Sequence, residues 1–153
     1  MKKMIVTIIA VLFSGSILFA QDYNAEADYI KSLIGIAKKD FISSIVDIPE
    51  DKTVDFWTIY NQYSEKQDKI GNDRVRLLLR YIGLFDSNDD KQYKNLIKDV
   101  FSVHKKSESN LKKYYKKIHK AISAKAAMQF FQAEEYLRSS IENKIYSDLP
   151  VNE

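Results

Sequence analysis

Apolar residues recur every three or four positions along most of this chain, which is the spacing of one face of an α-helix. The first such stripe lies within 24–45 and consists of Ile30, Leu33, Ile34, Ala37, Phe41 and Ile45. Sustained alternation of apolar and polar residues, and the Asn-Gly or Asp-Gly turns of hairpins, do not occur. The pattern therefore predicts an all-α chain.

Breaks in the pattern predict about four helices. Proline is tolerated in a first helical turn, so Pro49 fits the start of a second helix. The polar cluster at 86–90 is the strong interior loop signal, with Ser87 as a candidate N-cap, and Ser123 can cap the last helix. We expect the four helices to cover approximately 24–45, 50–84, 89–121 and 123–146.

Two of these helices carry long heptad stripes, which predict a long antiparallel hairpin around the loop near residue 87. The stripe of the second helix is Phe56, Tyr60, Tyr63, Gln67, Ile70, Arg74, Leu77, Tyr81 and Leu84. The stripe of the third helix is Ile97, Phe101, His104, Glu108, Leu111, Tyr115, Ile118 and Ile122. We expect Phe56, Tyr60, Leu111 and Ile118 to join the two helices.

Polar residues interrupt both stripes at one level of this hairpin. Gln67 and Arg74 fall near Phe101, His104 and Glu108 when the two helices are antiparallel. One interpretation is a hydrated layer that sets the register of a thin coiled-coil hairpin. The alternative is an open surface at which a partner or client binds.

The N-terminus has the organisation of an export signal. Two lysines precede an apolar run over 4–20, and Ala20 offers a cleavage site before polar sequence. The run is short for a membrane span of about 20 apolar residues, although a retained anchor is the alternative. We expect residues 1–20 to be a signal peptide cleaved near Ala20, and 21–153 to form a single periplasmic domain.

Composition excludes several classes of function. The chain has no cysteine, so disulfides, thiolate metal ligands and a lipid-modified cysteine are excluded. Nucleotide-binding glycine loops, the nucleophile elbow of hydrolases and the c-type haem motif do not occur. Export separates the chain from nucleic acid. We therefore expect a non-enzymatic protein with no cofactor and no nucleic-acid partner.

A basic stripe lies in the third helix, where seven lysines between His104 and Lys120 accompany one acidic residue, Glu108. Such charge attracts acidic or partly unfolded chains at long range, and interleaved tyrosines add apolar contact. Tyr114 and Tyr115 cannot both face a core, so one of them should be at least half exposed. The expected client-binding residues are Lys105, Lys106, Lys112, Lys113, Tyr114, Lys116, Lys117 and Lys120. A merely solvated face, or contact with an anionic membrane surface, is the alternative.

His104 and Glu108 lie four residues apart, a spacing at which two helix side chains can bind one metal ion. The sequence has no further histidine or cysteine nearby that would complete a site. We therefore interpret the two residues as a structural pair within the seam, the line of contact between the two helices of the hairpin, and assign no metal.

Two segments of the chain echo each other at a fixed offset. Ile48 precedes Phe56 and Trp57 in the first segment, as Ile122 precedes Phe130 and Phe131 in the second. Eight residues are little more than two helical turns, so each aliphatic residue and the first aromatic lie on nearly the same face. We expect Phe56 to be a core residue, Trp57 to be closer to the surface, and the second aromatic pair to divide in the same way.

These motifs resemble those of the Spy/CpxP group of periplasmic helical proteins, which carry paired L-T-x-x-Q motifs. The sequence from Phe56 to Tyr63 is similar to the F-W-x-x-Y-x-x-Y extension found in a divergent branch of the family, and includes Trp57 and Tyr60. The preceding Leu, Thr and Gln positions of the motif are occupied by Ile48, Pro49 and Lys52.

The second motif reads Ile122, Ser123 and Ala126 at the same positions, so neither copy keeps the glutamine. It continues through Phe130 and Phe131 to Glu134, which is similar to the family's aromatic-Gln-x-Glu stretch. The resemblance spans nearly all of the chain that follows the signal. The motif residues that it indicates are Ile48, Phe56, Trp57, Tyr60, Tyr63, Ile122, Ser123, Phe130, Phe131 and Glu134.

The resemblance implies a thin four-helix fold that forms a curved antiparallel homodimer. Members of the family act as ATP-independent chaperones, as regulators that bind an envelope-stress sensor kinase, or, in a few cases, as metal sensors. We therefore expect a periplasmic stress-type chaperone that binds unfolded envelope proteins. The alternative is an accessory regulator that binds one signalling partner, either a sensor kinase or a sigma/anti-sigma system.

Overall fold

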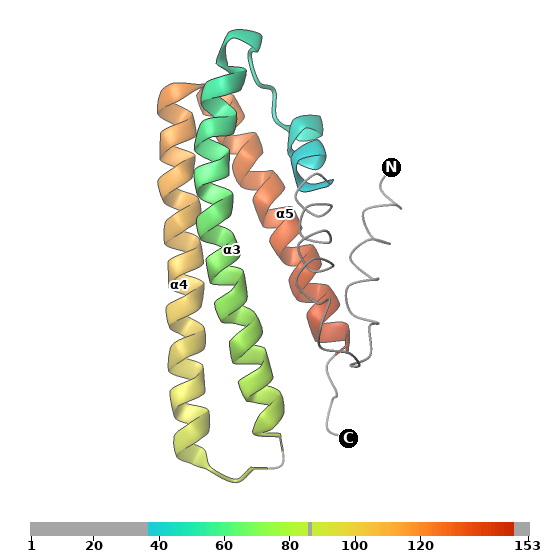
Figure 1. Ribbon diagram of the computed structural model, residues 1–153, viewed down its shortest axis with the longest axis vertical. Coiled ribbons are helices and arrows are strands. Elements are labelled where there is room, and N and C mark those ends of the chain that lie inside the picture. The colour runs from blue at the N-terminus through green and yellow to red at the C-terminus, as the bar shows by residue number, and fades with distance from the viewer. Residues whose placement is uncertain (1–36, 86, 149–153) are drawn as a thin grey trace, which may run out of the picture. The chain divides into compact units, whose positions relative to one another are not determined.

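A computed structural model describes residues 37–85 and 87–148, and Figure 1 shows the helices of each part. Every regular element within the described ranges is a helix, so the predicted all-α fold is confirmed. The predicted signal peptide over 1–20, and most of the helix expected over 24–45, lie outside the described residues.

The chain divides into two units, with the boundary after Val46. In the first unit the structure describes a helix over 37–45, which ends where the sequence predicted. The second unit, Asp47–Glu153, contains the short 3-10 helix η1 (Glu50–Lys52) and three long helices. The single domain expected over 21–153 stays a prediction.

Two long helices of the second unit, α3 (Thr53–Gly83) and α4 (Asp90–Ala121), lie side by side (Figure 1). The contacts between them pair increasing positions in α3 with decreasing positions in α4. Examples are Gln62 with Lys117 at 3.0 Å, and Arg80 with Asp99 at 2.6 Å. The predicted long antiparallel hairpin is therefore confirmed, with helix ends close to those expected.

The N-terminus of α4 is capped by Asp89. Its carboxylate accepts hydrogen bonds from the backbone N–H groups of Lys91 and Gln92, at 3.0 and 3.1 Å. Ser87 lies two residues earlier in the sequence, and its hydroxyl oxygen accepts a hydrogen bond from the N–H of Asp89 at 3.1 Å. The prediction of Ser87 as the N-cap is therefore wrong, because Ser87 stabilises the turn that leads to the capping residue.

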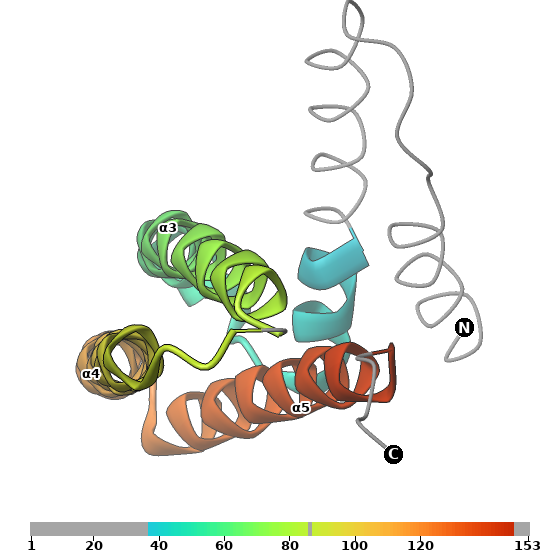
Figure 2. The ribbon, with the colours of Figure 1, turned by 90° about the horizontal axis from the view of Figure 1, so that it is seen from below.

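The third long helix, α5 (Ala124–Asp148), begins at the predicted cap, since the hydroxyl oxygen of Ser123 accepts a hydrogen bond from the N–H of Ala126 at 3.0 Å. From its start, α5 slants away from α4, as both views show (Figures 1 and 2). The first half of α5 therefore covers α4, whereas the second half leaves α4 open.

The core of the second unit lies near the start of α3, the end of α4 and the start of α5. The four residues predicted to join α3 and α4 are all buried, with exposed fractions of 0% for Phe56, 1% for Tyr60, 7% for Leu111 and 0% for Ile118. Burial of large side chains from all three helices supplies the main free energy that holds them together.

The seam of α4 differs from the predicted stripe in the half nearer the α3–α4 loop. The buried residues there are Leu96, Val103, Ser107 and Asn110. Four predicted seam residues are instead exposed, namely Ile97, Phe101, His104 and Glu108. The predicted stripe follows the face of α4 that includes Tyr115, whose ring contacts Phe131 of α5 at 6.4 Å. Because α5 slants away, the same face is open farther along the helix.

A polar layer does interrupt the seam, but its partners on α4 differ from those expected. Gln67 donates a hydrogen bond from its amide to the Ser107 hydroxyl at 2.9 Å. Asn110 donates to the Gln67 side-chain oxygen at 3.2 Å and to the Tyr63 carbonyl at 3.4 Å. These groups satisfy one another within the hairpin, which favours the interpretation of a register-setting layer over that of an open binding surface.

Candidate functional site

Seven exposed lysines cover the outer side of α4 and form what we call the lysine face. The lysine face consists of Lys105, Lys106, Lys112, Lys113, Lys116, Lys117 and Lys120. Many of them lie three, four or seven residues apart, which keeps all seven on one broad side of the helix. Each of the seven lysines is exposed, as a client-binding role requires.

Tyr114, predicted to accompany these lysines at the surface, is a core residue with 2% of its surface exposed. It follows Ser107 by one heptad, so it faces α3, and its ring lies 5.7 Å from that of Tyr63. The ammonium groups of Lys113 and Lys117 lie 5.9 and 4.8 Å from the Tyr114 ring centre. Tyr115 is only partly exposed. The prediction that one of the two tyrosines is at least half exposed is therefore wrong.

A shallow groove of about 520 Å³ runs between α3 and α4. We call it the α3/α4 groove. It is lined by Lys66, Lys69, Ile70, Ser102, Lys105, Lys106, Ser109, Asn110 and Lys113. Three of these lysines belong to the lysine face, two come from α3, and the lining contains no carboxylate. The groove therefore concentrates positive charge from both helices around an apolar side chain.

The two echoing segments meet in an aromatic cluster. Phe56 and Phe130 are both fully buried, and the ring of Phe130 lies 6.2 Å from Tyr60 and 5.0 Å from Tyr63 in edge-to-face geometry. Trp57 is partly exposed and Phe131 is 37% exposed. The predicted division of each aromatic pair into a core residue and a more exposed residue is therefore confirmed.

Glu134 completes this cluster as a buried carboxylate with an exposed fraction of 5%. Tyr60 and Tyr63 donate hydrogen bonds to its two oxygen atoms, at 3.2 and 2.9 Å. Burial, and then the negative charge of Glu134, raise the pKa of both tyrosines well above their ordinary value of 10.0. Both tyrosines therefore stay protonated donors, and the three side chains tie α3 to α5.

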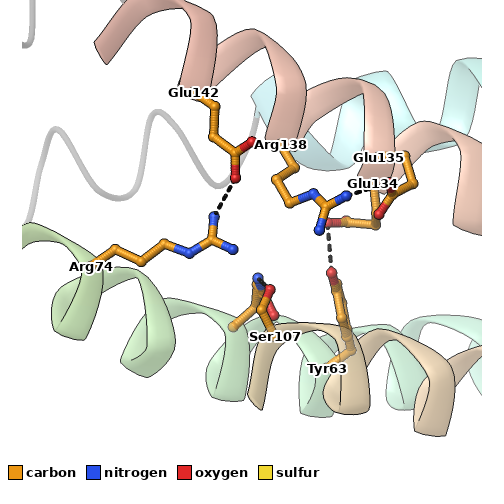
Figure 3. A network of polar contacts seen from close by, with 8 residues as sticks. Tyr63, Arg74, Ser107, Glu134, Glu135, Arg138 and Glu142 are labelled. Carbon is orange, nitrogen blue, oxygen red and sulfur yellow. Dashed lines mark hydrogen bonds and ion pairs between the residues drawn. The ribbon is translucent and has the colours of Figure 1, made fainter. Parts of the chain in front are cut away.

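A second polar strip joins α3 to α5 farther along (Figure 3). Arg74 donates to Glu142 at 3.1 Å, and Arg138 pairs with Glu135 on its own helix. The Nε and Nη2 atoms of Arg74 and the Nε of Arg138 are buried without a hydrogen-bond partner among the described residues. Because the carboxylate of Glu134 also lies nearby in Figure 3, the strip carries no excess positive charge that would attract an anion. We interpret it as structural.

His104 and Glu108 are both exposed on α4, outside the hairpin seam. The predicted structural pairing of these residues within the seam is therefore wrong, because the buried seam residues are Val103 and Ser107, each one residue earlier in the helix. Within the described residues, no group of three or more His, Cys, Asp or Glu side chains is arranged to hold a metal ion.

Large apolar side chains are exposed near the loop end of the hairpin, a feature that the sequence pattern missed. Phe101 is 68% exposed, Leu79 is 62% exposed and Ile97 is 48% exposed. Single exposed apolar residues are normal, but Ile97 and Phe101 are one helical turn apart on the face of α4 that α5 leaves open. The accessible surface of α4 therefore includes an exposed apolar part as well as the lysine face.

Comparisons of the chain with protein-family models, with curated proteins and with solved structures found no match. Within the described residues, we find no helix that combines the length and the hydropathy needed to cross a membrane.

Proposed function

We propose that this chain is an exported, non-enzymatic helical protein that binds unfolded or partly folded envelope proteins without ATP. One observation carries the proposal: the lysine face and the exposed apolar residues Ile97 and Phe101 lie on the same helix. The motif resemblance to the Spy/CpxP group also supports the proposal. It further implies that the protein acts as a homodimer.

The physical basis is a surface that combines charge with apolar contact. Lysines attract acidic or non-native chains at long range, and this attraction weakens as salt increases. Their aliphatic stems, together with the exposed side chains of Phe101 and Leu79, then offer apolar contact that does not require one particular partner sequence. Release would follow when the bound protein folds and buries its own apolar residues.

The test is suppression of aggregation by the purified protein, using several unrelated unfolded substrates. We expect slower aggregation with each substrate. Weaker suppression is expected for a variant with four charge reversals in the lysine face: Lys112→Glu, Lys113→Glu, Lys116→Glu and Lys117→Glu. A matched control places four reversals elsewhere: Lys39→Glu, Lys91→Glu, Lys94→Glu and Lys98→Glu. The control should retain most of the activity.

Failure to suppress aggregation at several-fold molar excess would remove the chaperone proposal. Tight binding to one sensor kinase or anti-sigma protein, with no effect on unrelated substrates, would instead support the regulator that the sequence left as the alternative. Equal losses in the two charge variants would mean that net charge, rather than the lysine face, controls binding.

A further inference from the structure

The α3/α4 groove brings together lysines that are far apart in the sequence. Lys66 and Lys69 belong to α3, whereas Lys105, Lys106 and Lys113 belong to α4. The antiparallel register of the hairpin places the two sets on opposite walls of one depression. The result is a binding surface with positive charge on both sides, which neither helix could provide alone.

The charge in this groove is only partly neutralised by the protein itself. Lys69 forms an ion pair with Glu65 at 2.9 Å. Lys66 and Lys113 approach the Tyr114 ring at 5.8 and 5.9 Å, a contact that holds the side chains but leaves their charge in place. The groove therefore keeps a surplus of positive charge, which an acidic ligand would complement.

The dimensions and the lining indicate what kind of acidic ligand fits. From Lys105 to Lys113 the helix advances about 12 Å, which is the length of roughly four residues of extended polypeptide. Ile70 contributes apolar surface between the charged walls. No arginine and no helix N-terminus lines the groove, so it lacks the bidentate guanidinium and the row of backbone N–H groups that hold a phosphate in a fixed geometry. Spaced ammonium groups around an isoleucine suit carboxylates carried on successive residues.

We propose that the α3/α4 groove binds a short acidic polypeptide segment whose carboxylates meet the lysines and whose apolar side chain contacts Ile70. This inference deepens the proposed function, because it identifies the part of a non-native protein that docks on the hairpin. Segments rich in glutamate and leucine are bound in preference to segments that lack either component.

The first experiment measures fluorescence anisotropy of a labelled peptide of alternating glutamate and leucine, titrated with the purified protein. Binding is expected, and its affinity decreases as ionic strength rises. A glutamate–serine peptide binds more weakly because it lacks the apolar contact, and a lysine–leucine peptide does not bind. Equal binding of the lysine–leucine peptide would overturn the proposal, as would binding to phosphatidylglycerol vesicles with no binding to the acidic peptide.

The second experiment locates the site with matched charge reversals. The groove variant carries Lys66→Glu, Lys105→Glu and Lys106→Glu. The control variant carries the same charge change on α4 outside both the groove and the lysine face: Lys91→Glu, Lys94→Glu and Lys98→Glu. We expect the groove variant to bind the glutamate–leucine peptide at least tenfold more weakly, and the control to change by less than threefold. Circular dichroism checks that both variants remain helical.

Ile70→Ser tests the apolar contact separately. It should reduce the preference for the glutamate–leucine peptide over the glutamate–serine peptide while leaving the salt dependence unchanged. Equal losses in the groove and control variants would overturn the proposal that the groove is the site. If only the groove variant loses peptide binding and the original protein fails to suppress aggregation, the groove is supported as the peptide site and the chaperone proposal is removed. If the protein suppresses aggregation but its peptide binding does not depend on the groove, the chaperone proposal is supported and the proposed groove site is removed.

Discussion

Tyr60 donates a hydrogen bond to Glu134 across 74 residues of sequence, and this separation equals the offset that relates Phe56 to Phe130. One pair of positions related by this offset, Tyr60 and Glu134, therefore makes direct contact in the folded chain. Phe56 and Phe130 anchor the cluster, and the tyrosine and the glutamate supply complementary polar groups. The second segment is thus the packing partner of the first, which gives the repeated motif a structural role.

Glu134→Ala should destabilise the protein by about 2–5 kcal/mol, because it removes the acceptor that two buried tyrosine hydroxyls share. Glu134→Gln should cost clearly less, since an amide oxygen can still accept one of the two hydrogen bonds. Urea unfolding followed by circular dichroism measures both losses. A loss below about 1 kcal/mol for Glu134→Ala would contradict the importance of this buried acceptor.

Stability should decrease above about pH 10, with a slope of about 1.4 kcal/mol per pH unit for each of Tyr60 and Tyr63. The folded state raises the pKa of both tyrosines above 10.0, so at lower pH the folded and unfolded states hold the same protons. At higher pH the unfolded tyrosines ionise first, which favours the unfolded state. The free energy of unfolding, measured by urea titration from neutral to high pH, tests this expectation.

The control for this pH dependence is the double variant Tyr60→Phe and Tyr63→Phe. Its stability should decrease less steeply above pH 10, because the two groups that cause the difference in proton binding are absent. Identical slopes for the double variant and the original protein would show that other groups dominate.

The polar layer of the hairpin should respond differently to single and combined substitution. Asn110→Leu alone should cost about 1–3 kcal/mol, because it leaves the side-chain oxygen of Gln67 without a donor in a partly buried position. Replacing all three members together, as Gln67→Leu, Ser107→Ala and Asn110→Leu, should be close to neutral. Urea unfolding of the original protein, the three single variants and the triple variant measures the non-additivity, and additive losses would contradict a mutually satisfied layer.

Gly71→Ala should stabilise the protein by about 0.5–1 kcal/mol, because alanine restricts the unfolded chain and favours the helix. Gly71 lies in the middle of α3, and an added Cβ atom would meet no other atom within 4 Å, leaving out its sequence neighbours and the backbone of its own helix turn. Gly83→Ala is the matched comparison at the last residue of the same helix, where the gain should be smaller. Thermal unfolding compares the two, and destabilisation by Gly71→Ala would contradict the open surroundings.

The starts of the helices near Pro49 and Ser123 could be predicted from local sequence because each has a local cause. Pro49 begins the first turn before α3, and Ser123 caps α5 through its own hydroxyl oxygen. The pairing of aromatic residues followed from helical geometry, since a core residue and its neighbour must point to different faces. These features depend on residues within a few positions of one another.

The face of α4 that packs against α3 could not be predicted, because two apolar stripes compete there. Ile97 and Phe101 continue one stripe, whereas Leu96 and Val103 belong to the other, and periodicity alone does not choose between them. The choice depends on the direction of α5, which is a tertiary feature. The contribution of Lys66 to a shared groove also required the register of the hairpin.

The slant of α5 has a consequence for how this unit opens. Rings from α3, α4 and α5 pack together in the aromatic cluster, whereas α5 lies away from the α3–α4 loop (Figures 1 and 2). Two helices share less buried apolar area per residue, so local opening there costs less free energy than opening elsewhere. Backbone amides near the α3–α4 loop should therefore exchange with deuterium first. Unfolding of this unit would begin at the α3–α4 loop, and the hydrogen bonds from Tyr60 and Tyr63 to Glu134 would break last.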